Sequence, residues 1–149
     1  MSKNKNREYY SDVCLIIRIS GGIIMSEKLN TIQKRNKLNT VFAIGEKGNG
    51  NAYHTYEINH FQESENPIGK NYAILNFQNG GRNIEGSEHG ITAEDLLEIC
   101  RHRLQCFQTS EYACRENAAA LTKIEEALMW LNRRTEDRAE RNVLGINTK

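Results

Sequence analysis

The feature that most constrains this chain is a change in the spacing of its apolar residues. After about residue 91, apolar side chains recur every three or four positions, which is the period of an amphipathic α-helix. Before residue 79, β-branched and aromatic residues come in short runs, as they do in strands. The change predicts an α+β fold in which a small antiparallel N-terminal sheet is followed by helices.

The second half predicts two helices joined by a short turn. Thr92 and Asp95 have the spacing of a capping box at the start of a helix over residues 92–108. A longer helix is expected from about residue 113 to 141, with Gly145 as a stop signal shortly after it. The predicted apolar faces are Leu96, Cys100, Arg103, Leu104 and Phe107 on the first helix and Ala118, Leu121, Ile124, Leu128 and Leu131 on the second. Because a two-helix hairpin cannot cover both sides of such faces, we expect the hairpin to self-associate.

The first half predicts three strands, over residues 40–44, 51–58 and 72–77. The linker Gly45–Gly50 between the first two contains glycines that can adopt the positive φ angles of a tight turn. Together these runs fit a small sheet over about residues 39–78.

The segment before Met25 differs in composition from the rest. Gly21-Gly22-Ile23-Ile24-Met25 has the form of a bacterial ribosome-binding site, spacer and start codon read as protein. Residues 1–24 are therefore either an extension upstream of an internal start or a real N-terminal strand or tail. Residues 25–149 are expected to form a single domain that comprises the sheet, a Gly-rich loop over 79–91 and a helical hairpin over 92–141.

Composition excludes several classes of function. Twenty basic and 19 acidic side chains give a net charge of +1, which argues against a nucleic-acid polymer as partner. The four cysteines form no CxxC pair or zinc-finger spacing, so we expect buried or idle thiols of a reducing cytoplasm. No apolar run is long enough to span a bilayer. The four histidines show no catalytic or metal-ligating arrangement, so we expect neither an enzyme, a metal site nor a cofactor.

The Gly-rich loop contains the first candidate binding residue, Arg82. Glycines let a backbone approach a ligand closely, and the planar arginine fork suits a phosphate. The spacing from Gly81 through Gly86 to Ser87 imitates a P-loop but lacks its lysine, which argues against a nucleotide hydrolase. The alternative reading is an ordinary exposed loop.

Further candidates lie on the helices. Arg134, Arg138 and Arg141 share one helical face, which is either a surface of ion pairs or a stripe that faces phosphate. Around the interhelical turn, Phe107, Tyr112 and Asn117 could supply a ring that stacks on a purine and a carboxamide that pairs with its edge. By its spacing alone, Phe107 is more often a core residue than a stacking platform. Trp130 is read as an interface or core ring.

The chain closely resembles the phage anti-Thoeris sponge family, and its hairpin half also resembles the phage anti-CBASS sponges. The resemblance covers about residues 26–147 and rests on five motifs: GGRNIEGS at 80–87, TAEDLL at 92–97, RLQCFQ at 103–108, YACRENAAAL at 112–121 and NRRTEDR at 132–138. The sheet half is what favours the anti-Thoeris branch. Thr109-Ser110-Glu111 departs from relatives, whose turns tend to have smaller side chains and more glycine.

This resemblance implies a function that the residues alone leave open. It implies a protein of the host bacterial cytoplasm that binds glycocyclic ADP-ribose made by TIR-domain defence enzymes and sequesters it without cleavage. Phe107 would stack on the adenine, Asn117 would bond its edge, and Arg82 and Arg134 would grip the pyrophosphate. It also implies dimers or hexamers, with cyclic oligonucleotides as further ligands of some members. The alternatives are an enzyme that degrades such a signal, with His54 or Glu85 as base, and a structural phage assembly protein.

Overall fold

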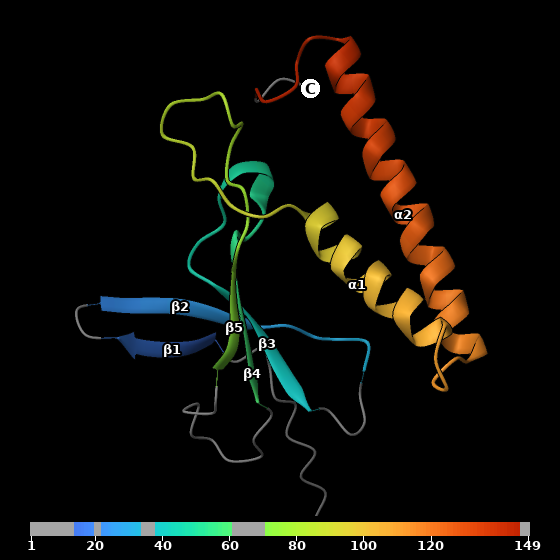
Figure 1. The fold of residues 1–149 in the computed structure, drawn as a ribbon. Helices are drawn as coiled ribbons and strands as arrows, with labels where there is room; N and C mark the ends of the chain where they lie inside the picture. Colours follow the sequence, from blue (N-terminus) through green and yellow to red (C-terminus); the bar gives the residue numbers. More distant parts are fainter. Residues whose placement is uncertain (1–13, 20–21, 34–37, 61–70, 147–149) are drawn as a thin grey trace, which may run out of the picture. The chain divides into compact units, whose positions relative to one another are not determined.

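The computed structural model describes residues 14–19, 22–33, 38–60 and 71–146. The chain divides into two compact units (Figure 1). Met1–Leu75 contains nearly all of the sheet, and Asn76–Lys149 contains both α-helices. The α+β class predicted from the change in periodicity is therefore confirmed.

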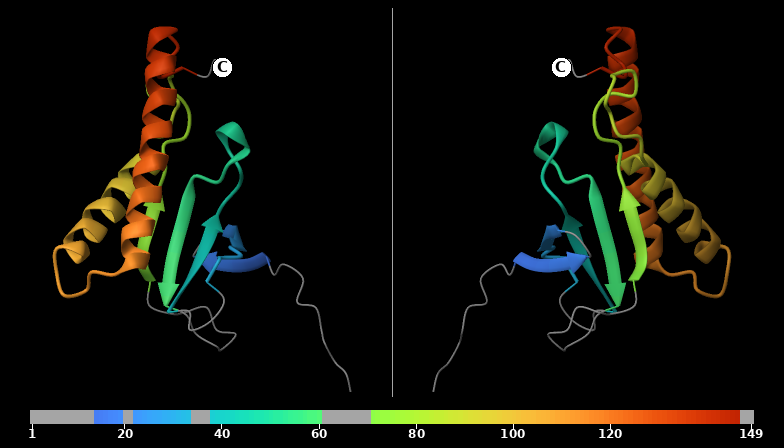
Figure 2. Two further views of the ribbon diagram at one scale, coloured as in Figure 1. Left: turned by 90° about the vertical axis from the view of Figure 1, so that its right-hand side faces the viewer. Right: turned by 90° about the vertical axis from the view of Figure 1, so that its left-hand side faces the viewer.

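The sheet has five strands in the order β1-β2-β3-β4-β5. Their bounds are β1 Cys14–Ile19, β2 Gly22–Lys28, β3 Asn39–Ile44, β4 Thr55–His60 and β5 Asn71–Asn76. The neighbours from β1 to β4 pair antiparallel, and the arrows of β4 and β5 point in opposite directions in Figure 2. The sequence predicted the last three strands, left an N-terminal strand within residues 1–24 open as an alternative, and did not predict β2.

The second predicted strand begins later than expected. The predicted run starts at Asn51, but Asn49–Asn51 form a short 3-10 turn and β4 starts at Thr55. The backbone in this connection reaches positive φ at Gly45 (82°), Gly50 (71°) and Asn51 (57°). Tyr53 therefore lies between the turn and β4, Tyr56 lies in β4, and the glycines play the role expected of them.

Two further strands precede the predicted sheet. β1 and β2 form a hairpin in which Cys14 lies opposite Glu27 and Ile19 opposite Gly22. β2 then pairs with β3 from Ser26 to Lys28. β2 begins with the strand formers Ile23 and Ile24 but ends with serine and two charged residues, so its last part, which pairs with β3, has a weak propensity of its own for strand.

The sheet unit has a small core of small side chains. Ala43 is fully buried, Ser26 is 1% exposed and Asn59 is 8% exposed. Around this core, polar contacts join the strands. The Tyr53 hydroxyl donates to Glu27 Oε2 over 2.8 Å, and Asn71 Nδ2 donates to Glu57 Oε1 over 2.6 Å.

The second unit contains the helical hairpin, and its bounds match the prediction within two residues. α1 spans Ala93–Gln108 and α2 spans Arg115–Glu140. Both halves of the predicted capping box are present, because the Thr92 hydroxyl accepts from the Asp95 N–H and the Asp95 carboxylate accepts from the Thr92 N–H. After α2, the left-handed residue is Asn142 (φ 56°), while Gly145 (φ 80°) belongs to the turn beyond it.

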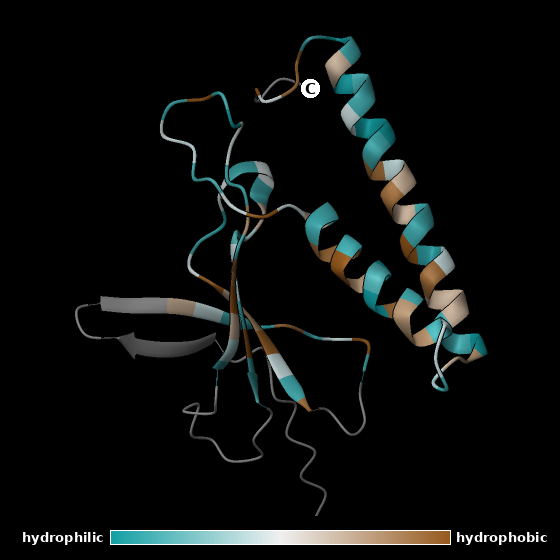
Figure 3. Ribbon diagram, viewed as in Figure 1, coloured by the Kyte–Doolittle hydropathy of each residue, from teal (hydrophilic) through white to brown (hydrophobic). Residues whose placement is uncertain are grey.

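Neither helix contains a fully buried residue. The predicted stripe of α2 is half-buried along Leu121, Ile124, Leu128 and Leu131, and apolar and polar segments alternate along both helices in Figure 3. The thiols are an exception to the prediction. Cys100, Cys106 and Cys114 are all exposed, so the expectation of buried thiols is wrong for these three residues in the single chain.

The Gly-rich loop is held at its base by backbone hydrogen bonds. Asn79 and Glu88 exchange both of their N–H···O=C bonds, at 2.9 and 3.0 Å. Further toward the sheet, the Gln78 N–H donates to the Ile91 carbonyl over 2.9 Å. This ladder fixes the two ends of the loop next to each other before α1 begins.

Candidate functional site: the ends of the helical hairpin

The interhelical turn is built around one glutamine. Gln108, the last residue of α1, donates from Nε2 to the Cys114 carbonyl over 3.1 Å and accepts at Oε1 from the Cys114 N–H over 3.0 Å. Cys114 in turn caps α2, because its Sγ accepts from the Asn117 N–H over 3.4 Å. A single side chain therefore ties the end of one helix to the start of the next.

Three of the residues around this turn form one cluster, which we call the turn cluster: Phe107, Tyr112 and Asn117. The Phe107 and Tyr112 rings meet edge to face, with centroids 6.4 Å apart. Asn117 Nδ2 donates to the Tyr112 carbonyl over 3.4 Å. Phe107 and Asn117 are half-buried, whereas Tyr112 is 67% exposed. The sequence expectation that these residues gather at the turn is met by their contacts.

A cation also lies on the Phe107 ring. The guanidinium carbon of Arg103 is 4.9 Å from the ring centroid, within the range of a cation–π contact. Arg103 was assigned to the apolar face by its spacing, but its side chain is exposed. The turn cluster thus offers an aromatic face, a nearby positive charge and a carboxamide. The Asn117 side-chain amide uses one N–H for the Tyr112 carbonyl, and its second N–H and its oxygen are the groups that could bind a ligand.

Arg82 lies on the Gly-rich loop, where its side chain is exposed. Its charge lies near the first turn of α1, where it contributes to a lowered pKa of Asp95. The main causes of that lowered pKa are the hydrogen bonds from the Thr92 N–H and hydroxyl, and the charge of Arg82 adds a smaller effect in the same direction. The prediction of an exposed cation in a Gly-rich loop agrees with this placement.

The three arginines that share a face of α2 play different roles. Arg141 pairs with Asp137 over 2.6 Å, and Arg138 Nη2 donates to the Val143 and Ile146 carbonyls. Arg134 is exposed and forms no ion pair with any carboxylate in the part of the chain that the structure describes. The ion-pair reading thus holds for Arg141, while Arg134 keeps its charge available.

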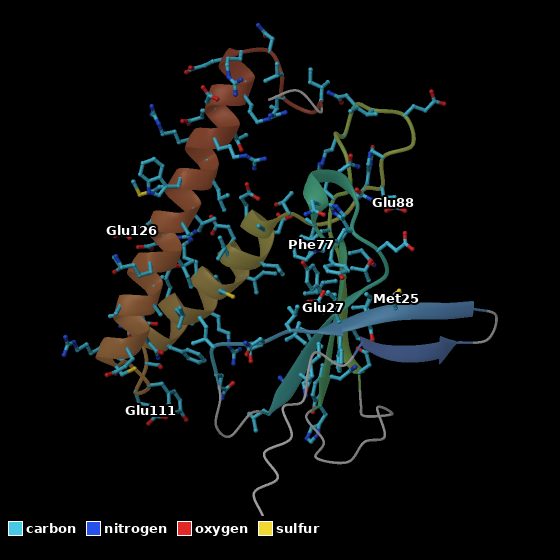
Figure 4. The ribbon with its side chains drawn as sticks, turned by 180° about the vertical axis from the view of Figure 1, so that it is seen from behind. Met25, Glu27, Phe77, Glu88, Glu111 and Glu126 are labelled. Atoms are coloured by element: carbon cyan, nitrogen blue, oxygen red, sulfur yellow. The ribbon has the colours of Figure 1, made fainter. Side chains whose placement is uncertain are left out.

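The predicted binding residues fall at two ends of the same unit. In Figure 4, Glu111 marks the interhelical turn and Glu88 marks the Gly-rich loop, at opposite ends of the unit. Asn117 and Arg134 are 17 residues apart on the continuous helix α2 (134 − 117), which amounts to about 25 Å at a rise of about 1.5 Å per residue. Phe107 and Asn117 are brought together, but they are not brought to Arg134 of the same chain.

Other kinds of site find less support. Within residues 14–146, leaving aside the segments outside the description, no group of three or more His, Cys, Asp or Glu side chains could hold a metal ion. His54 hydrogen-bonds through Nε2 to the Asn49 carbonyl over 3.1 Å, which gives the ring a structural contact within a turn. Among the helices described, none is long and apolar enough to cross a membrane.

Comparison with known proteins bears on this same unit. Residues 73–136, which include both ends of the interhelical turn, match the family described as Acb2/Tad1, hairpin domain. The helical hairpin and the loop before it are therefore similar to this hairpin domain. A relative named Thoeris anti-defense 1, from Bacillus phage SBSphiJ7, is 52% identical over 77 residues. The resemblance to the anti-Thoeris family is confirmed.

The aligned part covers 52% of this chain and 54% of the relative, so the chain spans about half the length of the curated relative that it matches.

Three features of the site were not predicted by any sequence pattern: the Gln108 bridge, the Cys114 cap and the contact of Arg138 with two carbonyls. The Cys114 cap joins residues three positions apart, and the other two features join residues five to eight positions apart near the end of a helix. The sequence signal that could have pointed to the cap is the position of Cys114 three residues before Asn117.

Proposed function

We propose that this protein binds glycocyclic ADP-ribose, a cyclic nucleotide signal of TIR-based antiphage defence, and sequesters it without cleavage. The Acb2/Tad1 hairpin domain and the name of the relative support an anti-defence role. The observation that carries the choice of ligand is the turn cluster, in which Phe107 and Asn117 are held together by Tyr112. An aromatic ring beside a carboxamide suits a purine, which offers a face to stack and an edge to bond.

The separation of about 25 Å between Asn117 and Arg134 shapes the proposed pocket. A cyclised ADP-ribose holds its adenine and both phosphates in one compact ring, so it cannot reach from one end of a hairpin to the other. We therefore infer a homo-oligomer in which the turn cluster of one protomer lies against Arg82 and Arg134 of another. The same arrangement would cover apolar side chains that the single chain exposes.

The energetics of such a pocket need no chemical step. A nanomolar dissociation constant corresponds to about −12 kcal/mol. A stacked base contributes about 1–3 kcal/mol and each charge-assisted hydrogen bond about 1.5–3 kcal/mol, so enclosure by two protomers can supply the remainder. A sequestering protein must also be abundant enough to deplete the signal, and in this proposal it acts in the cytoplasm of the infected bacterium.

One experiment separates this function from its alternatives. The purified protein is incubated with glycocyclic ADP-ribose, washed and heat-denatured, and the released nucleotide is identified by chromatography and mass spectrometry. Sequestration predicts intact ligand in an amount close to the number of sites, and Asn117→Ala should reduce the amount retained. Altered ligand would indicate an enzyme instead, and failure to retain any ligand would favour a structural protein.

A further inference from the structure

Arg82 lies between two residues that both contact the end of the chain. A Cβ atom added to Gly81 would lie 2.2 Å from the Gly145 carbonyl oxygen, closer than any real contact. On the other side, the Asn83 N–H donates to that same oxygen over 3.3 Å. The backbone on both sides of Arg82 is therefore placed by Gly145, which is 63 positions away in the sequence (145 − 82).

The segment that Gly145 belongs to, residues 141–146, is itself held in place, and we call it the C-terminal turn. Arg138 Nη2 donates to the Val143 carbonyl over 2.8 Å and to the Ile146 carbonyl over 2.6 Å. The Val143 N–H returns a bond to the Arg138 carbonyl over 2.9 Å. One guanidinium thus closes the turn onto the last part of α2.

The space between Gly145 and the Gly-rich loop is too small for a side chain at residue 145. Its φ of +80° is one that side chains disfavour, and a Cβ there would lie 2.8 Å from Asn83 Nδ2. Gly86, in the same loop, has the same φ of +80°, yet a Cβ there would meet nothing within 4 Å. The two glycines share a backbone conformation and differ in contact, which makes Gly86 a matched control.

We propose that the C-terminal turn positions Arg82 for an anionic ligand, with Gly81 and Gly145 permitting the backbone contact and Arg138 locking the turn. The phosphate that Arg82 would meet rests on the function proposed above. Arg138 is a positioning residue in this arrangement, because its guanidinium binds backbone carbonyls of its own chain. The three arginines on one helical face therefore have different roles, and the proposal predicts that the affinity for the ligand depends on residues 141–146.

The test compares three glycine variants of the full chain by calorimetry with glycocyclic ADP-ribose. Gly81→Ala and Gly145→Ala should weaken binding about ten- to hundred-fold, the range expected for loss of one charge-assisted contact, and Gly86→Ala should change it much less. In the Arg82→Ala background, Gly145→Ala should cause no further loss, because it acts through Arg82. Losses that add in full, or a Gly145→Ala protein with wild-type affinity, would overturn the proposal.

A second measurement needs no ligand and keeps the two proposals apart. The exchange rate of the Asn83 amide, followed by NMR, should rise in Gly145→Ala and in Arg138→Met but not in Gly86→Ala. Unchanged exchange in the first two variants would refute the positioning contact. If exchange behaves as expected while the wild-type protein binds no glycocyclic ADP-ribose, the proposed function fails and the positioning of Arg82 stands.

Discussion

The sheet unit and the helical unit differ in how much apolar surface each buries. The sheet unit buries Ala43 completely and also buries Ser26 and Asn59, whereas α1 and α2 contain no buried residue. On the helices, Trp130 is 73% exposed and Met129 is 71% exposed. Exposed apolar surface of this kind is typical of a protein–protein interface. The sheet unit also exposes large apolar side chains, such as Ile32 at 99% and Leu38 at 75%, so the two units differ in what they bury and not in whether they expose apolar surface.

The largest effect is expected when the two units are produced as separate fragments, which tests whether the helical unit alone drives association. A fragment of residues 76–149 keeps the loop ladder and both helices, and we expect it to form oligomers as the full chain does, because its apolar faces have no other cover. A fragment of residues 25–80 should not associate. Light scattering at micromolar concentration measures both. A full-length protein that is monomeric there would contradict the proposed pocket between protomers.

The next largest effects are expected from the two arginines of the proposed phosphate end. Arg82→Ala and Arg134→Ala should each weaken ligand binding about ten- to hundred-fold, or about 1.5–3 kcal/mol, because each leaves phosphate charge without its partner. Lys123→Ala is the control, since Lys123 already pairs with Glu126 over 2.9 Å. Calorimetry with wild-type affinity in both arginine variants, and with the fold intact, would remove them from the site.

Phe107→Ala tests whether the turn cluster serves binding or packing. A stacking role predicts a loss of about 1–3 kcal/mol in binding, while a core role predicts a lower melting temperature through a cavity. The control in the sheet unit is Tyr53→Phe, which removes the hydrogen bond to Glu27 at a cost of about 1 kcal/mol in stability. That variant should leave affinity unchanged. A Phe107→Ala protein that melts much lower yet binds normally would assign the ring to the core.

The smallest effect concerns the cap of α1 and its dependence on pH. The Thr92 hydrogen bonds hold the pKa of Asp95 below its ordinary 3.8. A carboxylate with a lowered folded-state pKa stabilises the fold above its unfolded pKa, and this contribution disappears as the pH falls through the folded value. Asp95→Asn should therefore be less stable than wild type near neutral pH and nearly equal to it in strong acid. Thermal melts across the acid range measure the difference, and a constant difference would contradict the capping role.

The two units also differ in how well the sequence predicted them. The bounds of α1 and α2 follow from local signals, the three- and four-residue spacing and the Thr92–Asp95 box, and they were found within two residues. β1 was left open as one of two alternatives and β2 was not predicted, because a strand is stabilised mainly by its neighbours. The register of Ser26 with Ile44 cannot be read from either segment alone.

For the site, the sequence predicted that Phe107, Tyr112 and Asn117 gather at the interhelical turn, but not the contacts that hold them there. Gln108 connects the two sides of the turn through hydrogen bonds between its side chain and the Cys114 backbone, and no periodicity reveals such a contact. The contact between Gly81 and Gly145 joins two distant segments and becomes visible only when the chain has folded.

The pairing of β1 has a consequence for the hypothesis that translation starts at Met25, which itself stays a prediction. β1 covers β2 from Gly22 to Glu27, and β2 meets β3 only from Ser26 onward. A chain that began at Met25 would keep the pairing of β2 with β3. Without β1, the other edge of β2 would have unpaired N–H and C=O groups, which can pair with a strand from another molecule. Long and short products would then share one hairpin and differ in how readily their sheets recruit a foreign strand.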